Sequence, residues 1–148
     1  MKLLFLILLG ASSLAQAQFQ GRWVGQGSLT HSTGRIEKCS LLIDIEETPA
    51  VFFVKKSIFQ CESMKIENKN PQPLDIKNGE LWWGPRRLGI ITDRLIQTAM
   101  QSPDGRKQAY KLELAQPHLM NYFDSVEWTL AYSTQLSGRL QRQAIRRR

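Results

Sequence analysis

The sequence is poor in the residues that build metal sites and catalytic centres. It contains only two histidines, His31 and His118, and each lies in a segment predicted to be a turn or loop. A structural zinc site needs clustered Cys and His ligands, and the chain has no such spacing. The G-x-S-x-G motif of the α/β-hydrolases is also absent. The sequence therefore identifies no metal ligands, no cofactor and no catalytic residues, and we expect both histidines to be solvated.

Long hydrophobic runs are missing too. The longest run, residues 3–9, is too short to span a bilayer as a helix. It follows the positive charge of Lys2, and Ala15-Gln16-Ala17 then matches a small-residue cleavage motif. A retained N-terminal core helix is disfavoured because no polar face recurs within the run. The pattern predicts a signal peptide over residues 1–17, with export of the mature chain to a periplasm or to the extracellular space.

Acidic residues are absent from the C-terminal end. No Asp or Glu follows Glu127, although the whole chain carries a formal charge of +7. Five arginines lie beyond that point: Arg139, Arg142, Arg146, Arg147 and Arg148. A basic end on an exported protein favours anionic surfaces over nucleic acid, and a solvated tail is the plainer interpretation. We expect a single folded domain over residues 18–138 and a basic tail over residues 139–148.

There are only two cysteines, Cys39 and Cys61. An even number of cysteines in an exported chain predicts a disulfide. The turn-forming residues 47–50 lie nearly midway between the two cysteines, so a chain reversal there would bring them together on adjacent strands. Closing this loop would contribute about 3 kcal/mol to the free energy of unfolding.

Helical periodicity is also lacking. No stretch maintains it over three turns, and residues 134–146 form at most a short helix. Apolar and polar side chains instead alternate along much of the chain, which is typical of half-buried strands. The expected inward-facing sets lie within residues 19–29, 39–45, 110–114 and 126–132.

Two segments carry further signs of β-structure. Residues 51–54 are apolar on both faces and are followed by Ile58-Phe59, which predicts either a strand buried on two sides or a strand with a bulge. Asn78-Gly79, between two short apolar runs, predicts a type I′ hairpin. With turns at regular spacing, the pattern predicts an all-β fold, a single small antiparallel up-and-down β-barrel of about eight strands.

The segment Phe19-Gln20-Gly21-Arg22-Trp23 has the form F-x-G-x-W and lies at the start of the first predicted strand. It resembles the opening of the calycin barrels, which include lipocalins, fatty-acid-binding proteins and avidins. The resemblance implies that Gly21 permits a bend, that Trp23 closes the base of a barrel, and that a ligand cavity opens at one end. It also implies a basic residue packed over the Trp ring, a role that we expect Arg139 to take. No binding or catalytic residue follows from the resemblance.

Two hypotheses of function follow from these features. In the first, the barrel binds a small apolar or amphipathic ligand, and the candidate wall residues are Trp23, Phe53, Trp83, Tyr110, Trp128 and Tyr132. In the second, a barrel with a solid core binds an anionic lipid or polysaccharide of the cell envelope. The candidate residues for that contact are Arg86, Arg87, Arg139 and Arg142.

The densest cluster, residues 82–87, leaves two interpretations open. Its two tryptophans and two arginines can stack on a sugar or clamp an acidic ligand. Alternatively, one tryptophan lies in the core, the other shields the surface, and the arginines are solvated at a turn.

Two further functions remain as alternatives. An enzyme would require the fold to gather separated residues such as Asp93, Asp124 and His118 in a cleft. An inhibitor of secreted enzymes would use a protruding loop, for which residues 68–73 are the candidate.

Overall fold

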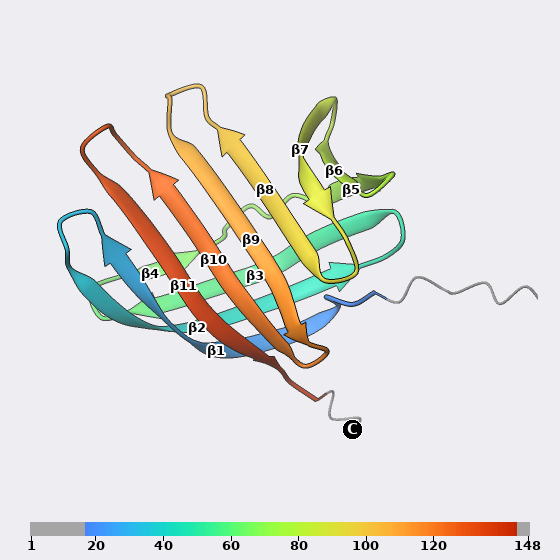
Figure 1. Cartoon of the computed structure of the whole chain (residues 1–148), viewed down its shortest axis with the longest axis horizontal. Coiled ribbons are helices and arrows are strands. Elements are labelled where there is room, and N and C mark those ends of the chain that lie inside the picture. The colour runs from blue at the N-terminus through green and yellow to red at the C-terminus, as the bar shows by residue number, and fades with distance from the viewer. Residues whose placement is uncertain (1–16, 145–148) are drawn as a thin grey trace, which may run out of the picture.

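The computed structural model describes residues 17–144, which form an antiparallel all-β barrel (Figure 1). The predicted signal peptide lies outside the described residues except for Ala17, as do the last four residues of the predicted tail. Within residues 17–144 there is no helix, and therefore none that is long and apolar enough to cross a membrane.

Eleven strands make up the described part of the chain. They are β1 (Gly21–His31), β2 (Ile36–Glu47), β3 (Val51–Cys61), β4 (Lys65–Glu67), β5 (Leu74–Lys77), β6 (Glu80–Trp83), β7 (Arg86–Ile91), β8 (Leu95–Gln101), β9 (Lys107–Gln116), β10 (Leu119–Glu127) and β11 (Ser133–Arg142).

Ten of these strands close the barrel. Each pairs with the next barrel strand along the chain, and β11 pairs with β1 to complete the ring. β4 lies outside the ring because it pairs only with the C-terminal half of β3, whose N-terminal end pairs with β5. The predicted count of about eight strands is therefore too low. The count is higher because the three short strands β5, β6 and β7 are separate members of the barrel sheet.

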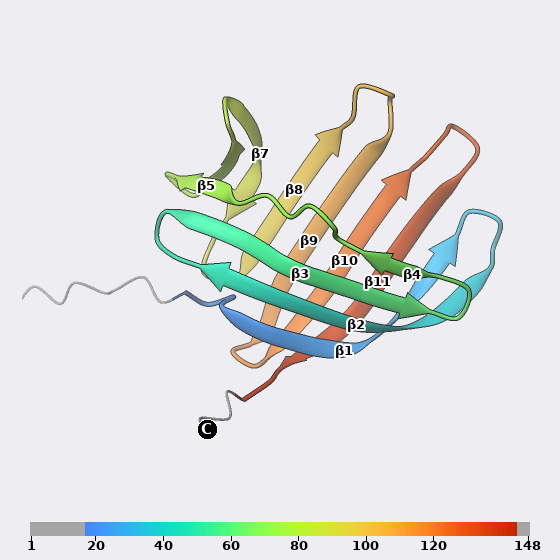
Figure 2. The same ribbon diagram turned by 180° about the vertical axis from the view of Figure 1, so that it is seen from behind.

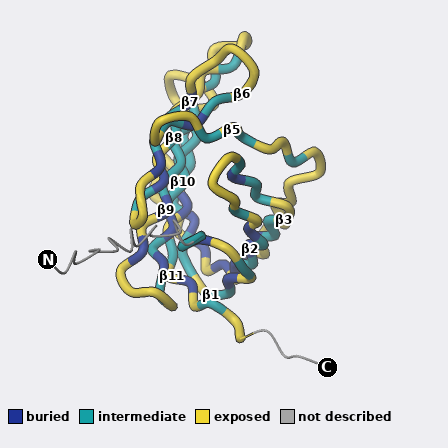
Figure 3. Tube along the Cα trace, turned by 90° about the vertical axis from the view of Figure 1, so that its right-hand side faces the viewer, coloured by how far each residue is buried: buried dark blue, intermediate teal, exposed yellow. Residues whose placement is uncertain are grey.

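The barrel is flattened into two walls. The long strands β1, β2 and β3 form one wall and cross over β8–β11, which form the other (Figures 1 and 2). Seen from the side in Figure 3, the two walls enclose the interior, and the segment between β3 and β5 runs along its border. The strands of the two walls carry the apolar side chains that pack between them.

A bulge in β3 explains why buried apolar residues occur in both phases of this strand. Asp44 of β2 pairs with Lys56 and Ile45 pairs with Val54, so that Lys55 has no partner across the ladder. The extra residue reverses the alternation of side chains along the strand. Phe52 and Phe59 are consequently both buried although they occupy opposite phases of the strand. Of the two predicted alternatives, the bulged strand is the one that the structure contains.

Glycines allow β1 and β11 to approach closely. A Cβ atom at Gly25 would lie 1.9 Å from the carbonyl oxygen of Arg139, and one at Gly27 would lie 2.2 Å from that of Ser137. Both distances are far below any tolerable contact, so a side chain at either position would push the strands apart. These two glycines permit the pairing that closes the barrel.

The short helix expected within residues 134–146 is wrong. β11 occupies residues 134–142 of this segment and pairs with β1 on one side and β10 on the other. Leu136 and Leu140 are both buried, and their spacing of four mimics a helix. Gly138 lies between them in the same phase of the strand, so the true period is two. Because β11 continues to Arg142, residues 139–142 belong to the barrel wall and not to a tail.

The inward set expected at residues 126–132 is also wrong. β10 ends at Glu127, and residues 128–132 form the turn that leads into β11. Apolar and polar residues happen to alternate through this turn, and the alternation conceals the end of the strand.

Two local predictions are confirmed. Cys39 and Cys61 form a disulfide between paired positions of β2 and β3, with their Cα atoms 4.1 Å apart. Asn78 and Gly79 both have positive φ angles, 52° and 74°, as a type I′ turn between β5 and β6 requires.

The base of the barrel is closed around Trp23. This side chain is fully buried, and its indole nitrogen donates a hydrogen bond of 2.8 Å to the carbonyl oxygen of Phe19. The guanidinium carbon of Arg142 lies 4.6 Å from the Trp23 ring centroid, which is a cation–π contact. The basic residue over the ring is therefore Arg142. Arg139, which we expected there, is exposed on the outer face.

Candidate ligand-binding site

A cavity of about 460 Å³ lies between the two walls of the barrel. This volume is within the range of about 300–1,000 Å³ that is typical of small-molecule sites. Apolar side chains of β2, β3, β5 and β7 form much of its lining: Ile43, Val54, Phe59, Leu74 and Leu88. The envelope-binding hypothesis assumed a solid core, but the interior of the barrel contains this cavity.

One side of the cavity is polar. It consists of Gln108 and Tyr110 on β9 and of Tyr122 and Asp124 on β10, four residues that the antiparallel register brings together. The Gln108 amide donates to the Asp124 carboxylate at 3.1 and 3.3 Å, and the Tyr122 hydroxyl donates to it at 3.3 Å. Asp124 forms no ion pair with any described residue. Its negative charge is therefore held only by neutral donors.

Burial shifts the ionisation of this group of residues. Desolvation raises the pKa of Asp124, and the hydrogen bonds from Gln108 and Tyr122 oppose the shift. Burial and the nearby Asp124 raise the pKa of Tyr110 and Tyr122 far above the ordinary tyrosine value. Both hydroxyls therefore keep their protons at neutral pH and can donate hydrogen bonds.

The Tyr110 hydroxyl is buried and has no hydrogen-bond partner among the described residues. Its ring packs edge-on against Tyr122 with centroids 5.6 Å apart, and Tyr122 packs in turn against Phe59 at 5.1 Å. The rings therefore form a fixed aromatic platform, and the platform presents one unused hydroxyl group to the cavity.

The cavity opens to solvent beside β4. Ile66 of β4 and the following residues Asn68 and Gln72 line it, so the segment outside the barrel ring borders the opening. Trp83 on β6 and Met100 on β8 also line it and are 50% and 37% exposed. These large apolar side chains are half in solvent and half in the cavity, as the mouth of a site for an apolar ligand requires.

The structure brings together only two of the six candidate wall residues. Trp83 and Tyr110 line the cavity. Trp23 lies in the closed base, and Phe53 lies on the outer face, since Phe52 is the buried member of that pair. Trp128 and Tyr132 are in the turn between β10 and β11 and do not line the cavity.

Sequence reasoning missed most of the polar side of the cavity. From the sequence, Asp124 is a candidate only as a residue of a possible enzyme, and Gln108 and Tyr122 are not among the candidates. The signal was present in β10, where Tyr122 and Asp124 continue the inward phase that begins at Met120. A charged residue in the inward phase of a barrel strand is the feature that identifies this site.

The candidate anion-binding arginines do not form one cluster. Arg87 donates to Glu80 at 2.6 Å, and Arg86 donates to the carbonyl oxygen of Gln101 at 3.1 Å. Arg139 and Arg142 are on β11, with Arg142 turned over Trp23. Of the cluster at residues 82–87, one tryptophan borders the cavity and both arginines are exposed.

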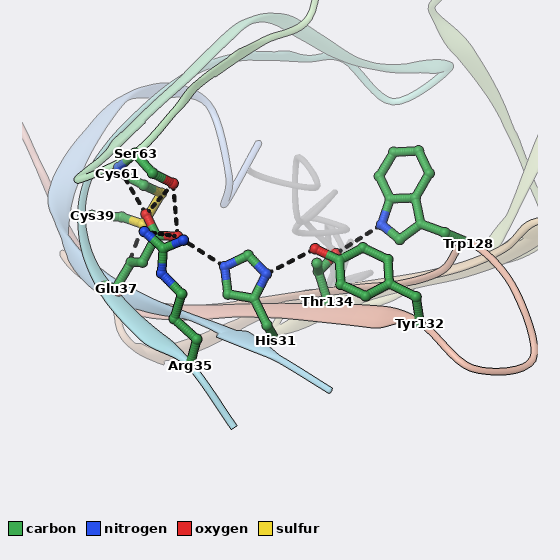
Figure 4. Close-up of polar contacts among 9 residues, drawn as sticks. All are labelled: His31, Arg35, Glu37, Cys39, Cys61, Ser63, Trp128, Tyr132 and Thr134. Carbon is green, nitrogen blue, oxygen red and sulfur yellow. Dashed lines mark hydrogen bonds and ion pairs between the residues drawn. A yellow bond between two sulfur atoms is a disulfide. The ribbon is translucent and has the colours of Figure 1, made fainter. Parts of the chain in front are cut away.

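A second polar cluster surrounds the disulfide (Figure 4). Glu37 is fully buried and accepts hydrogen bonds from the Ser63 backbone N–H at 2.8 Å and from the Ser63 hydroxyl at 2.7 and 2.8 Å. It also contacts His31 Nε2 at 2.9 Å and Arg35 at 3.3 Å. The Ser63 bonds above all lower the pKa of Glu37 to about 2.

This cluster has the geometry of a structural clamp and not of a catalytic triad. The Ser63 hydroxyl donates to the Glu37 carboxylate, whose lowered pKa makes it a weak base, and His31 does not contact the serine because its Nδ1 faces the Tyr132 hydroxyl at 2.8 Å. Instead, Glu37 ties the turn after β3 to the hairpin between β1 and β2. His31 is buried, so the expectation that it is solvated is wrong; His118 is exposed as expected.

The remaining candidate catalytic residues do not lie together in one site. Asp93 and His118 lie in turns at the ends of β7 and β9, away from the cavity that Asp124 lines. Across residues 17–144, no three His, Cys, Asp or Glu side chains are grouped so that they could hold a metal ion. The loop 68–73, considered for an inhibitor, borders the cavity through Asn68 and Gln72.

Comparisons with known proteins support the barrel fold. An S-type phycobiliprotein lyase from Guillardia theta has a TM-score of 0.63 and 12% identity, and the match covers 86% of this chain and 89% of the lyase. A DUF3598-family protein of unknown function from Nostoc punctiforme PCC 73102 has a TM-score of 0.60 and 12% identity, over 85% of this chain and 48% of that one. At such identities, the similarity shows a shared β-barrel fold alone. No protein-family model matches the chain, and no curated protein matches it.

Proposed function

We propose that the barrel binds a small, largely apolar ligand in the cavity between its walls. The observation that carries this proposal is the cavity itself, with its aromatic platform, its apolar lining and its half-exposed mouth. Protein interiors are ordinarily packed to near-crystalline density. A solvent-open cavity of about 460 Å³ between the walls of a small barrel departs from that rule, and ligand binding accounts for it.

Binding can be tested with N-phenyl-1-naphthylamine, a neutral dye whose fluorescence rises in apolar sites. We expect saturable enhancement with the wild-type protein. Thr98 lies on β8 and lines the cavity, so Thr98→Phe fills space and should weaken dye binding at least about 10-fold. Gln97 is the exposed neighbour on the same strand, and Gln97→Phe is the matched control. No enhancement by wild type, or equal binding by the two variants, would contradict the proposal.

We further propose that the protein works outside the cytoplasm, after removal of residues 1–17. The N-terminal pattern supports this, and the Cys39–Cys61 disulfide suits an oxidising compartment. Native mass spectrometry of protein exported with its own N-terminus would give the processed mass, the oxidation state and any retained ligand in one spectrum. An unprocessed or reduced chain would count against export.

A further inference from the structure

The charges that line the cavity are all negative. Among the described lining residues, only Glu67 and Asp124 are charged, and no Lys, Arg or His joins them. This contrasts with the chain as a whole, whose formal charge is +7. The sign of the site is therefore opposite to the sign of the protein, and it favours a cation entering the cavity.

Of the two carboxylates, Glu67 is paired with a cationic side chain among the described residues and Asp124 is not. Glu67 lies at the mouth and forms an ion pair of 3.0 Å with Lys65. Asp124 lies deeper and has only the Gln108 amide and the Tyr122 hydroxyl as donors. Asp124 is only partly exposed, and a carboxylate that is largely removed from water is unfavourable without a cationic partner. Asp124 is thus the single uncompensated charge in the cavity lining.

We propose that the cavity selects an amphipathic cation, a ligand with an apolar body and a protonated nitrogen that donates to the Asp124 carboxylate. The inference rests on the ligand-binding function proposed above and adds the chemical class of the ligand. The Tyr110 hydroxyl, unused in the protein, accepts a second N–H from the same nitrogen. The rings of Tyr110, Tyr122 and Phe59 hold the apolar body, and their faces attract a nearby positive charge.

The test compares three probes that share one aromatic body and differ only in charge. They are 1-naphthylmethylamine, which is a cation at pH 7, 1-naphthylmethanol, which is neutral, and 1-naphthoate, which is an anion. Dissociation constants are measured by isothermal titration calorimetry on the mature protein. A charge-assisted hydrogen bond predicts that the amine binds about 10- to 100-fold more tightly than the alcohol. The anion should bind most weakly of the three.

The variant Asp124→Asn removes the charge and keeps the shape of the side chain. It should reduce the preference for the amine to near unity and leave the affinity for the alcohol nearly unchanged. Asp93→Asn removes the same charge at an exposed turn outside the cavity and should leave the preference intact. Circular dichroism on both variants confirms that each is folded.

The outcomes separate this inference from the function on which it rests. If all three probes bind with similar affinity, or if the anion binds best, the cation inference is overturned while ligand binding stands. An amine preference that survives in Asp124→Asn also overturns it. If no probe binds and N-phenyl-1-naphthylamine does not bind either, the ligand-binding function itself fails.

Discussion

Replacing Tyr110 with phenylalanine should stabilise the free protein, which is the reverse of the usual effect of a core substitution. The hydroxyl of Tyr110 is buried and lacks a hydrogen-bond partner among residues 17–144. An unsatisfied buried polar group destabilises a fold by about 1–3 kcal/mol, and Phe removes the group without changing the ring. Solvent that reaches the cavity reduces the effect, so we expect a gain of about 1 kcal/mol in the free energy of unfolding.

Tyr122→Phe is the matched comparison. Tyr122 lies beside Tyr110 in the same aromatic platform, but its hydroxyl donates to Asp124 at 3.3 Å. Removing that donor leaves the partly desolvated Asp124 carboxylate with one hydrogen-bond donor fewer and should lower the free energy of unfolding by about 1–2 kcal/mol. The two Tyr→Phe substitutions delete the same atom from neighbouring rings, and we expect effects of opposite sign.

Urea unfolding followed by circular dichroism at pH 7 measures both variants against the wild type. Thermal unfolding gives a second readout, in which about 1 kcal/mol corresponds to roughly 3–5 °C for a domain of this size. If Tyr110→Phe is destabilised as much as Tyr122→Phe, the Tyr110 hydroxyl has a partner in the free protein and our argument is refuted. The same variant should bind 1-naphthylmethylamine more weakly, so stability and binding should move in opposite directions.

Three further predictions test other parts of the structure. Gly25→Ala places a Cβ 1.9 Å from a carbonyl oxygen of β11 and should abolish cooperative unfolding by circular dichroism; Gly34→Ala, in open space at a φ of 90°, should lower stability by only about 1–2 kcal/mol. Replacing Cys39 and Cys61 with serine should lower the free energy of unfolding by about 3 kcal/mol, and wild type in reductant should match it in urea titrations. The pKa of Glu37 is lowered to about 2, so its carboxylate stabilises the fold above the unfolded value near 4.5 and loses that effect as the pH falls towards 2. The stability gap between wild type and Glu37→Gln should therefore close over that pH range, and a constant gap would contradict the clamp.

Local signals in the sequence predicted much of the fold. The Asn78-Gly79 turn and the Cys39–Cys61 pairing depend on residues close in sequence or on one hairpin, so pattern reasoning reached them. The β11 strand was missed because its inward residue Gly138 has no side chain, which leaves the two flanking leucines at a helical spacing. The burial of His31 is harder to predict, because one of its two partners, Tyr132, lies far away in the sequence, in the turn before β11. The pairing of β11 with β1 brings Tyr132 to it, whereas Glu37 lies nearby on β2.

The candidate site was harder to predict for a similar reason. A cavity forms where side chains from several strands leave space between them, and the sequence of a single strand does not show this. Thr98 on β8 and Ser57 on β3 line the cavity, and each is unremarkable in its own strand. The polar residue that distinguishes the site, Asp124, was visible as a charge in an inward phase, but its lack of a cationic partner depends on the residues of every facing strand.

The cavity and the cross-links near it are parts of one arrangement. An open cavity leaves its end of the barrel with fewer apolar contacts than a packed core would supply. The disulfide of Cys61 lies in the same inward phase of β3 as Phe59, which lines the cavity. Beyond it, Glu37 holds the turn at Ser63 through three hydrogen bonds. Covalent and polar links therefore hold β2 and β3 in place where apolar packing is interrupted, so that the barrel can keep a binding space without losing its wall.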